Sequence, residues 1–166
     1  MQSEILAYGF SASQGILSRN LAGTSHEESL LVREGCINNV NWLAGHILAT
    51  RGRLMALLNA GETLLTPEES AMYGRGSHPL QPGDPCVRLE KLVEGLQSSA
   101  AAILERLRAM QDADFEAALD PSNFPIKPEK ATVGARVAFL LLHEGYHAGQ
   151  IGTVRRLLGK PSGLGV

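Results

Sequence analysis

The 166-residue chain has little excess charge of either sign. Its 15 Lys and Arg residues nearly balance 17 Asp and Glu residues, which gives a formal net charge of −2. Nucleic-acid binding depends on clustered basic residues that neutralise many phosphates, so the sequence predicts no nucleic-acid partner. With 44% hydrophobic and 19% charged residues, the composition is typical of a globular domain and not of a disordered chain.

Cysteines and long hydrophobic runs are also scarce. Cys36 and Cys86 are too few for a disulfide framework and form no C-x-x-C pair, which is typical of a reducing compartment. The longest clean apolar run, residues 137–142, is far short of the roughly 20 residues that span a bilayer. The first residues also lack the basic start and apolar stretch of a signal peptide. The sequence therefore predicts a soluble, cytoplasmic protein with no membrane contact.

The apolar residues recur at helical spacing, and no segment shows the alternation of a strand. The predicted helices cover about 6–21, 36–59, 84–110 and 132–158. Gly23, Gly61 and Gly159 follow three of them as C-terminal stops, and Asp84 with Pro85 is typical of a helix start. The length fits one domain, residues 1–166, with its own core.

Short extra helices are predicted in two of the connections. Ser25 with Glu28, and Thr66 with Glu69, match the capping box, in which each side chain bonds to the other residue's backbone amide. Residues 74–84 and 120–130 are rich in turn formers and are predicted as loops. The sequence thus indicates an all-α protein, a four-helix bundle of the up-and-down type with short extra helices in the connections.

Two histidines four positions apart are the most informative pattern. His143 and His147 lie about 40° apart around a helix and roughly 6 Å apart along it, so both imidazoles can reach one ion. They share a face with Leu140 and Ile151, where burial of two polar rings is costly unless they are hydrogen-bonded or bind a metal. Two hydrogen-bonded core histidines are the alternative, but the ligand spacing favours a metal.

The natural third ligand is His46 in the second predicted helix. In an up-and-down bundle the second and fourth helices run parallel, and the positions of His46, His143 and His147 along them then agree in depth. The predicted metal ligands are these three residues. His26 lies in a polar capping segment and His78 in a Gly-rich loop, so both are predicted at the surface.

Several neighbours are candidates for supporting roles. Gln150 projects to the side of His143, where it could orient a ring or bond to a metal-bound water, or could equally be an interior polar residue. Glu144 could be a base near the metal, which is slightly favoured, or a hydrogen-bond partner of another helix. Trp42, one turn before His46, could line a pocket or belong to the core. Tyr146 and Arg53 are weaker candidates.

Residues 143–147 also match H-E-x-x-H, in which two histidines bind zinc and the Glu activates water in metallopeptidases. That interpretation needs a third ligand, and the short tail after His147 contains no Glu, Asp or His. No predicted sheet edge would hold an extended peptide. A metallopeptidase is therefore the minor alternative.

Three motifs stand out in the sequence: Asn38-Asn39-x-x-Trp42-x-x-Gly45-His46-Ile47, His143-Glu144-x-Tyr146-His147-x-Gly149-Gln150-Ile151 and Arg155-Arg156-x-x-Gly159. In these motifs the chain resembles the DinB-like (damage-inducible) superfamily of four-helix metalloproteins. The resemblance implies a divalent metal, commonly zinc or nickel, bound by the three histidines named above, and often a homodimer. Similar proteins include thiol S-transferases and isomerases that use bacillithiol or mycothiol, proposed hydrolases, and members with no established activity.

Three neutral imidazoles leave open positions on a metal ion, as in catalytic sites, although nitrogen ligands do not select one metal. Such an ion lowers the pKa of bound water or of a coordinated thiol. We therefore expect a metal-dependent thiol S-transferase or hydrolase that acts on a small-molecule substrate, with a low-molecular-weight thiol as the cosubstrate of the transferase. The competing hypothesis is a non-catalytic metal-binding or stress-response protein. Gly145, Gly149 and Gly152 indicate close helix packing, either within the chain or across a dimer seam.

Overall fold

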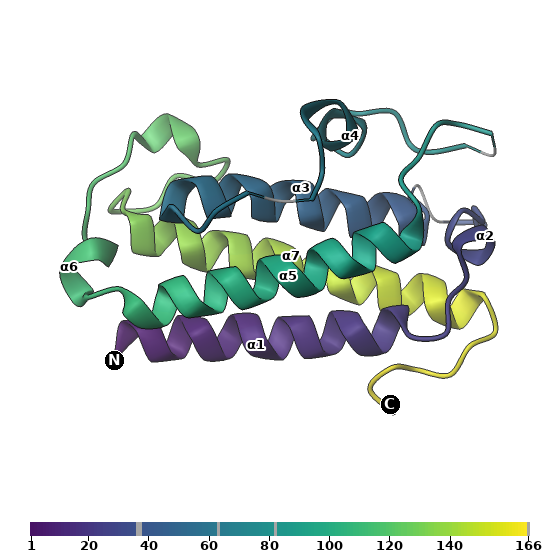
Figure 1. Cartoon of the computed structure of the whole chain (residues 1–166), viewed down its shortest axis with the longest axis horizontal. Coiled ribbons are helices and arrows are strands. Elements are labelled where there is room, and N and C mark those ends of the chain that lie inside the picture. Colours follow the sequence, from purple (N-terminus) through teal and green to yellow (C-terminus); the bar gives the residue numbers. More distant parts are fainter. Residues whose placement is uncertain (36–37, 63, 82, 166) are drawn as a thin grey trace.

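Four long helices pack side by side in the computed structural model, which describes residues 1–35, 38–62, 64–81 and 83–165 (Figure 1). They are α1 (Gln2–Leu21), α3 (Val40–Leu58), α5 (Leu89–Ala109) and α7 (Val133–Leu157). The connections carry α2 (His26–Ser29), α4 (Pro67–Met72), α6 (Asp112–Phe115) and the 3-10 helix η1 (Pro121–Asn123). The described residues form no strand, which confirms the prediction of an all-α bundle with short extra helices.

Local sequence signals account for most of the helix starts. The Asn39 and Thr132 side chains accept the N–H groups of Trp42 and Ala135 and so cap α3 and α7. Both predicted capping boxes are present at the starts of α2 and α4. Cys36, the predicted start of the second helix, lies outside the described residues.

The predicted start of the third helix is wrong. That helix, α5, begins at Leu89 and not at Asp84 with Pro85. The Asp84 carboxylate instead accepts the backbone N–H of Gln81 at 2.8 Å, and the Asp84 N–H donates to the Gln81 carbonyl. An acidic residue followed by proline suits a tight turn as well as a helix start, so the local sequence did not distinguish the two.

The core consists of two apolar clusters along the bundle. One includes Leu43, Leu48 and Leu92, and the other includes Phe10 and Leu54. Between them lies a layer of buried polar side chains, one from each long helix. This polar layer consists of Ser13, Arg51, Ser99 and Glu144.

Cross-helix contacts define the direction of each helix. Successive contacts from α3 meet successive positions of α5, because Asn41 bonds to Val87, Arg51 to Ser99, and Leu58 to Arg106. The two helices therefore run parallel. In the same way α1 and α7 are parallel, since Ser13 bonds to Glu144 and Asn20 bonds to Ala148. Along the chain, the four long helices α1, α3, α5 and α7 therefore run up, down, down and up, and α3 is antiparallel to α7.

The bundle itself is as predicted, but the simple up-and-down order of its helices is wrong. The connection 59–88 runs back along the bundle, so α5 starts at the same end as α3 (Figure 1). Tyr73 fastens this crossover, because its buried hydroxyl donates to Asn41 Oδ1 at 3.0 Å and accepts the Val87 N–H at 2.8 Å. A long connection allows a parallel neighbour that a short turn does not.

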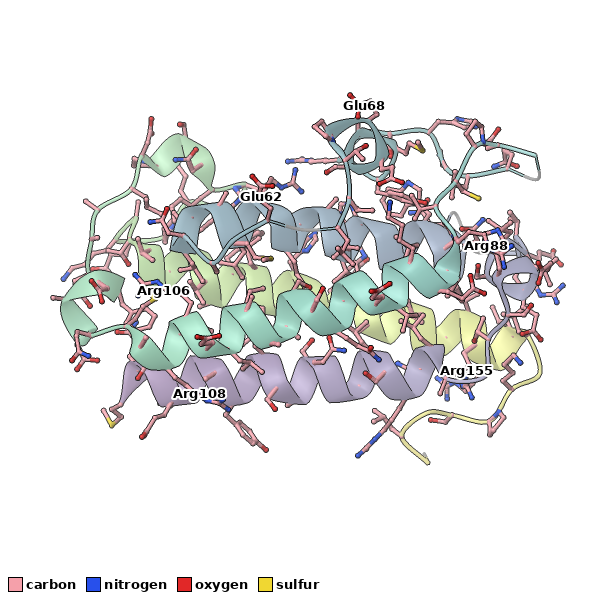
Figure 2. All side chains as sticks on the ribbon, viewed as in Figure 1. Glu62, Glu68, Arg88, Arg106, Arg108 and Arg155 are labelled. Atoms are coloured by element: carbon pink, nitrogen blue, oxygen red, sulfur yellow. The ribbon has the colours of Figure 1, made fainter. Side chains whose placement is uncertain are left out.

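Two arginines fasten opposite ends of the bundle (Figure 2). Arg106 of α5 donates to the Leu58 carbonyl at the C-terminal end of α3, at 2.8 Å. Arg155 of α7 donates to the carbonyls of Asn20 and Pro161 at 3.2 and 2.7 Å. The bonds to Leu58 and Asn20 satisfy carbonyls at helix ends, which lack partners within the helix, and the bond to Pro161 holds the C-terminal segment against α7. None of the described helices combines the length and low charge that a membrane crossing needs.

Candidate metal centre

Three imidazole rings from α3 and α7 meet at one point beside the core. The Nε2 atom of His143 lies 3.2 Å from Nε2 of His46 and 3.2 Å from Nε2 of His147. The structure thus brings together the three histidines that the sequence selected. The other two lie elsewhere: His26 accepts the Leu89 N–H through its Nδ1 atom, and His78 is exposed.

The rings meet although the helices run in opposite directions. His46 lies in the early part of α3, and the antiparallel α7 presents its middle, with His143 and His147, at that level. The predicted residues are therefore together, but the parallel packing from which their common depth was argued is wrong. Trp42, one turn before His46, stacks on that ring with a centroid distance of 4.7 Å and an interplanar angle of 8°.

Hydrogen bonds at the outer nitrogens orient two of the rings. His46 Nδ1 lies 2.7 Å from the Tyr73 carbonyl, and His147 Nδ1 lies 2.7 Å from Gln150 Oε1. Because both oxygens only accept, each Nδ1 carries the proton and donates it. The Nε2 atoms of these two rings then present lone pairs toward His143, an arrangement common in metal-ligating histidines.

The surroundings keep all three rings neutral at pH 7. Burial lowers the pKa of His46 and of His147, and the hydrogen bonds to Tyr73 and Gln150 oppose this only in part. Burial, together with repulsion from the other two imidazoles, lowers the pKa of His143 to about 4. Neutral imidazoles are the form that binds a metal.

The donor set fits a divalent metal ion. Lone pairs that face one another repel unless a proton or a cation lies between them. For zinc–nitrogen bonds of 2.0–2.1 Å in tetrahedral geometry, two ligand nitrogens are about 3.3 Å apart, which is close to the 3.2 Å of both His143 contacts. The Nδ1 atom of His143 is buried and has no hydrogen-bond partner among the described residues. Neutral nitrogen donors suit zinc, nickel and several other ions.

A cavity of about 590 Å³ opens beside the three imidazoles. Its lining residues include the aromatic residues Trp42, Phe124 and Phe139 and the basic residues Arg53, Arg75 and Arg136. The histidine nitrogens therefore face a space in which a small molecule can lie. Sites that close around a metal with protein ligands alone have no such access.

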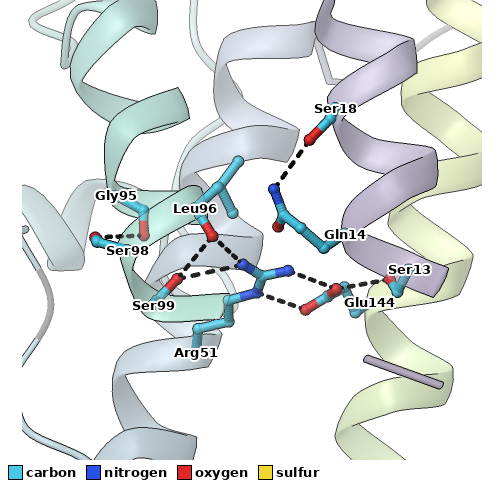
Figure 3. A network of polar contacts seen from close by, with 9 residues as sticks. All are labelled: Ser13, Gln14, Ser18, Arg51, Gly95, Leu96, Ser98, Ser99 and Glu144. Carbon is cyan, nitrogen blue, oxygen red and sulfur yellow. Dashed lines mark hydrogen bonds and ion pairs between the residues drawn. The ribbon is translucent and has the colours of Figure 1, made fainter. Parts of the chain in front are cut away.

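Glu144 lies in the polar layer and not in the cavity (Figure 3). Its two carboxylate oxygens accept hydrogen bonds from Arg51 Nε and Nη2, each at 2.7 Å, and the Ser13 hydroxyl donates to it at 2.6 Å. Glu144 is therefore a hydrogen-bond partner of other helices, as one of its two predicted roles had it. The other role, a base near the metal, was favoured and is wrong. One residue beyond His143 means a rotation of about 100° around α7, which turns the side chain into the core.

This placement also removes the basis of the metallopeptidase alternative. In H-E-x-x-H enzymes the Glu acts on a water at the metal, whereas the oxygens of Glu144 are engaged by Arg51 and Ser13. Gln150 orients the His147 ring, which is one of its proposed roles. Trp42 both contacts His46 and lines the cavity, and its Nε1 donates to Ser77 at 3.0 Å.

Sequence reasoning missed part of the cavity wall. Arg136, Phe139 and Phe124 line the cavity although they lie outside the sequence motifs, and the sequence marks Arg53 only weakly. The signal for Arg136 is its position two helical turns before His143 on α7, which places both on one face. No sequence signal connects Phe124, from the loop after η1, with His46 on α3.

Comparison with known proteins agrees with the fold. The model of a family described as the DinB superfamily matches residues 11–151. A crystal structure of a conserved protein from Enterococcus faecalis is similar, with a TM-score of 0.71 at 18% sequence identity over 95% of this chain and 98% of that one. No protein of curated function matches the sequence.

Proposed function

The chain belongs to the DinB superfamily, and from that premise we propose that it is an enzyme whose His46, His143 and His147 hold one divalent metal ion, zinc or nickel. We further propose that it acts on a small molecule as a thiol S-transferase or a hydrolase. The observation that carries this proposal is the convergence of three neutral imidazoles beside an open cavity. A non-catalytic metal store needs no such space.

A bound divalent ion would lower the pKa of a coordinated thiol or water enough to supply a nucleophile near neutral pH. The residues of the chain prepare the site for it. Gln150 and the Tyr73 carbonyl hold the rings of His147 and His46 with Nε2 free. The stacked Trp42 ring and the wall residue Phe139 exclude water from one side of the reacting groups.

The thiol of a transfer reaction would come from a cosubstrate and not from the protein. Cys86 does not line the cavity, and burial raises the pKa of its thiol, which makes it a weaker nucleophile at neutral pH. A low-molecular-weight thiol of the cytoplasm is therefore the cosubstrate that we propose.

Elemental analysis of the purified protein tests the metal site. We expect about one divalent ion per chain in the wild type and close to none in His143→Ala, because two imidazoles bind such ions far more weakly than three. His78→Ala removes an exposed histidine and is the matched control, with unchanged metal content. Unchanged metal content in His143→Ala contradicts the ligand set.

The reaction type is tested with the metal-loaded protein. A halonitrobenzene is supplied with bacillithiol, mycothiol, glutathione or cysteine, and a nitrophenyl ester is supplied without thiol. Thiol-dependent conjugation that His143→Ala abolishes supports the transferase, and ester cleavage alone supports the hydrolase. Stoichiometric metal with no turnover of either substrate favours the non-catalytic alternative.

As the macromolecular partner we propose a second copy of the chain. Gly145 and Gly149 of α7 are exposed, and a Cβ added to either meets nothing within 4 Å among the described residues. Packing within the chain therefore does not explain these glycines. The same helix exposes Leu142 and Tyr146, at 71% and 65%. Buried apolar groups of this size stabilise homodimers.

Sedimentation velocity tests this homodimer. We expect a dimeric wild type and a monomeric Leu142→Glu, because the substitution would bury a charge in the interface. Ala101→Glu places the same charge on the exposed face of α5 and should remain dimeric. A monomeric wild type, or an unaffected Leu142→Glu, contradicts the proposal.

A further inference from the structure

The cavity beside the histidines is lined by positive charge without a counter-charge. Arg53, Arg75 and Arg136 contribute to its wall, and no Asp or Glu does so within the described parts of the chain. The ion pairs of the described residues lie elsewhere and involve Arg51, Arg88 and two lysines. Three arginines therefore line the cavity, and none of them forms an ion pair with a carboxylate of the described residues.

Arg136 is the most constrained of these cations. Its Nη1 atom is buried and has no hydrogen-bond partner in the described parts of the chain. The guanidinium carbon lies 5.7 Å from the ring centroids of both Phe124 and Phe139, so aromatic rings hold the group in place without bonding to its N–H donors. A buried donor without a partner is destabilising, and more so when it carries a charge. A partner from outside the chain would remove that cost.

Arg53 brings a second guanidinium to the same side of the histidines. It lies two turns after His46 on α3, whereas Arg136 lies two turns before His143 on α7. Two turns are about 10 Å of helix, and because α3 and α7 are antiparallel, both displacements point to the same end of the bundle. Burial lowers the pKa of Arg136, and repulsion from Arg53 lowers it further, as expected for two cations at one cavity. Arg53 Nη2 donates to Thr50 Oγ1 at 3.1 Å, which orients it.

We propose that the small molecule bound in this cavity is an organic anion with an apolar body, whose carboxylate is bound by Arg136 and Arg53. Guanidinium groups match carboxylates with two parallel hydrogen bonds, and the Trp42, Phe124 and Phe139 rings suit the apolar body. The carboxylate end lies toward the arginines and the reactive end toward the three histidines. This inference rests on the proposed function, since it names the substrate class of the same site.

Fluorine NMR with two probes of the same shape tests the inference. The probes are 4-fluorobenzoate and its uncharged counterpart 4-fluorobenzamide, titrated into the purified protein with and without prior treatment with a chelator. We expect the acid to bind about tenfold more tightly than the amide in both preparations. Charge-assisted hydrogen bonds are worth about 1.5–3 kcal/mol, so Arg136→Gln and Arg53→Gln should each weaken binding of the acid about tenfold or more.

Arg156→Gln is the matched control, since it removes an exposed arginine from the same helix, and it should bind like the wild type. Equal affinity for acid and amide, or unchanged affinity in both arginine variants, overturns the inference. Arg53 is exposed, so Arg53→Gln folds even where Arg136→Gln does not. Binding of the acid only before chelation makes the anion a metal ligand and overturns the arginine assignment while leaving the metal site intact. If the purified protein contains no metal but still binds the acid, the arginine assignment stands and the proposed metal site fails.

Discussion

Two polar clusters join α3 to α7, and they differ in whether the chain completes them. Arg51 and Glu144 lie in the polar layer, and each is close in sequence to a histidine of the metal centre. The guanidinium and carboxylate bond to each other, to Ser13 and to Ser99, so the layer supplies its own donors and acceptors. In the histidine cluster, by contrast, the Nε2 atoms of His46 and His147 both present lone pairs toward His143, whose buried Nδ1 has no partner among the described residues. The complete cluster is satisfied by the chain alone, whereas the incomplete one could hold a metal ion.

The complete cluster also positions the incomplete one. Arg51 and Glu144 are only 1% and 3% exposed, and a charge buried so deeply is stable only where its partner reaches it. Sliding of α3 along α7 would separate the pair. The same register sets His46 of α3 against His143 of α7. The polar layer is therefore expected to hold the geometry of the metal centre without taking part in its chemistry.

The largest expected effect comes from breaking the complete cluster. Glu144→Ala leaves the Arg51 guanidinium buried without its counter-charge, and we expect a loss of about 3–5 kcal/mol in the free energy of unfolding. Urea unfolding of the chelator-treated protein measures it. The control Glu105→Ala removes an exposed glutamate from α5 and should change stability by less than about 0.5 kcal/mol. Equal losses of unfolding free energy in Glu144→Ala and Glu105→Ala would contradict the structural role of the polar layer.

Breaking the incomplete cluster should affect only the stability that the metal supplies. Zinc present at about 100 times its dissociation constant should stabilise the wild type by about 2.7 kcal/mol. His143→Ala should lose this gain, while its stability after chelator treatment stays near that of the wild type. Thermal unfolding with and without zinc measures both quantities. A zinc-induced gain in His143→Ala would show that the ion stabilises the protein from another site.

A smaller effect is expected from the residue that orients a ligand. Gln150→Ala removes the acceptor at Nδ1 of His147, and loss of such an orienting partner typically weakens metal binding about 10- to 100-fold. Competition with a chromogenic chelator measures the affinity. Thr153→Ala, one turn beyond on the exposed side of α7, is the control and should retain the wild-type affinity. Equal affinities of Gln150→Ala and the wild type contradict the orienting role.

The last expected effect is a pH dependence of the chelator-treated protein. In the unfolded chain His143 titrates near 6.5, whereas in the folded chain its pKa is about 4. Between these values the unfolded state binds more protons, so stability falls as the pH drops from about 6.5 toward 4. Urea midpoints across this range measure the slope, and His143→Ala should show a shallower one. Identical slopes would contradict the lowered pKa.

The sequence predicted the helices and the pair of candidate ligands His143 and His147 for local reasons. Helical periodicity and the capping residues Ser25 and Thr66 act within one or two turns, and the i, i+4 spacing of His143 and His147 is itself local. Glu144 shows the limit of the same reasoning. Its neighbours in sequence indicated a metal site, but its direction around α7 brought it to Arg51, a residue far away in the sequence. The predicted helix start at Asp84 was wrong for a similar reason, because a turn and a helix start share the same local sequence pattern.

By itself, the sequence determined that the protein is all-α and about where its long helices lie, since both follow from apolar periodicity and capping residues. It also singled out His46, His143 and His147 as the candidate metal ligands, from the i, i+4 spacing and the motifs around them. Only the tertiary structure decided the directions of the helices. The crossover 59–88 makes α3 antiparallel to α7, and this alone brings Arg53 and Arg136 to one side of the histidines. Helix direction depends on where a long connection packs, and that packing depends on contacts such as those of Tyr73 with Asn41 and Val87. Such contacts join residues too far apart in sequence for any local pattern to record them.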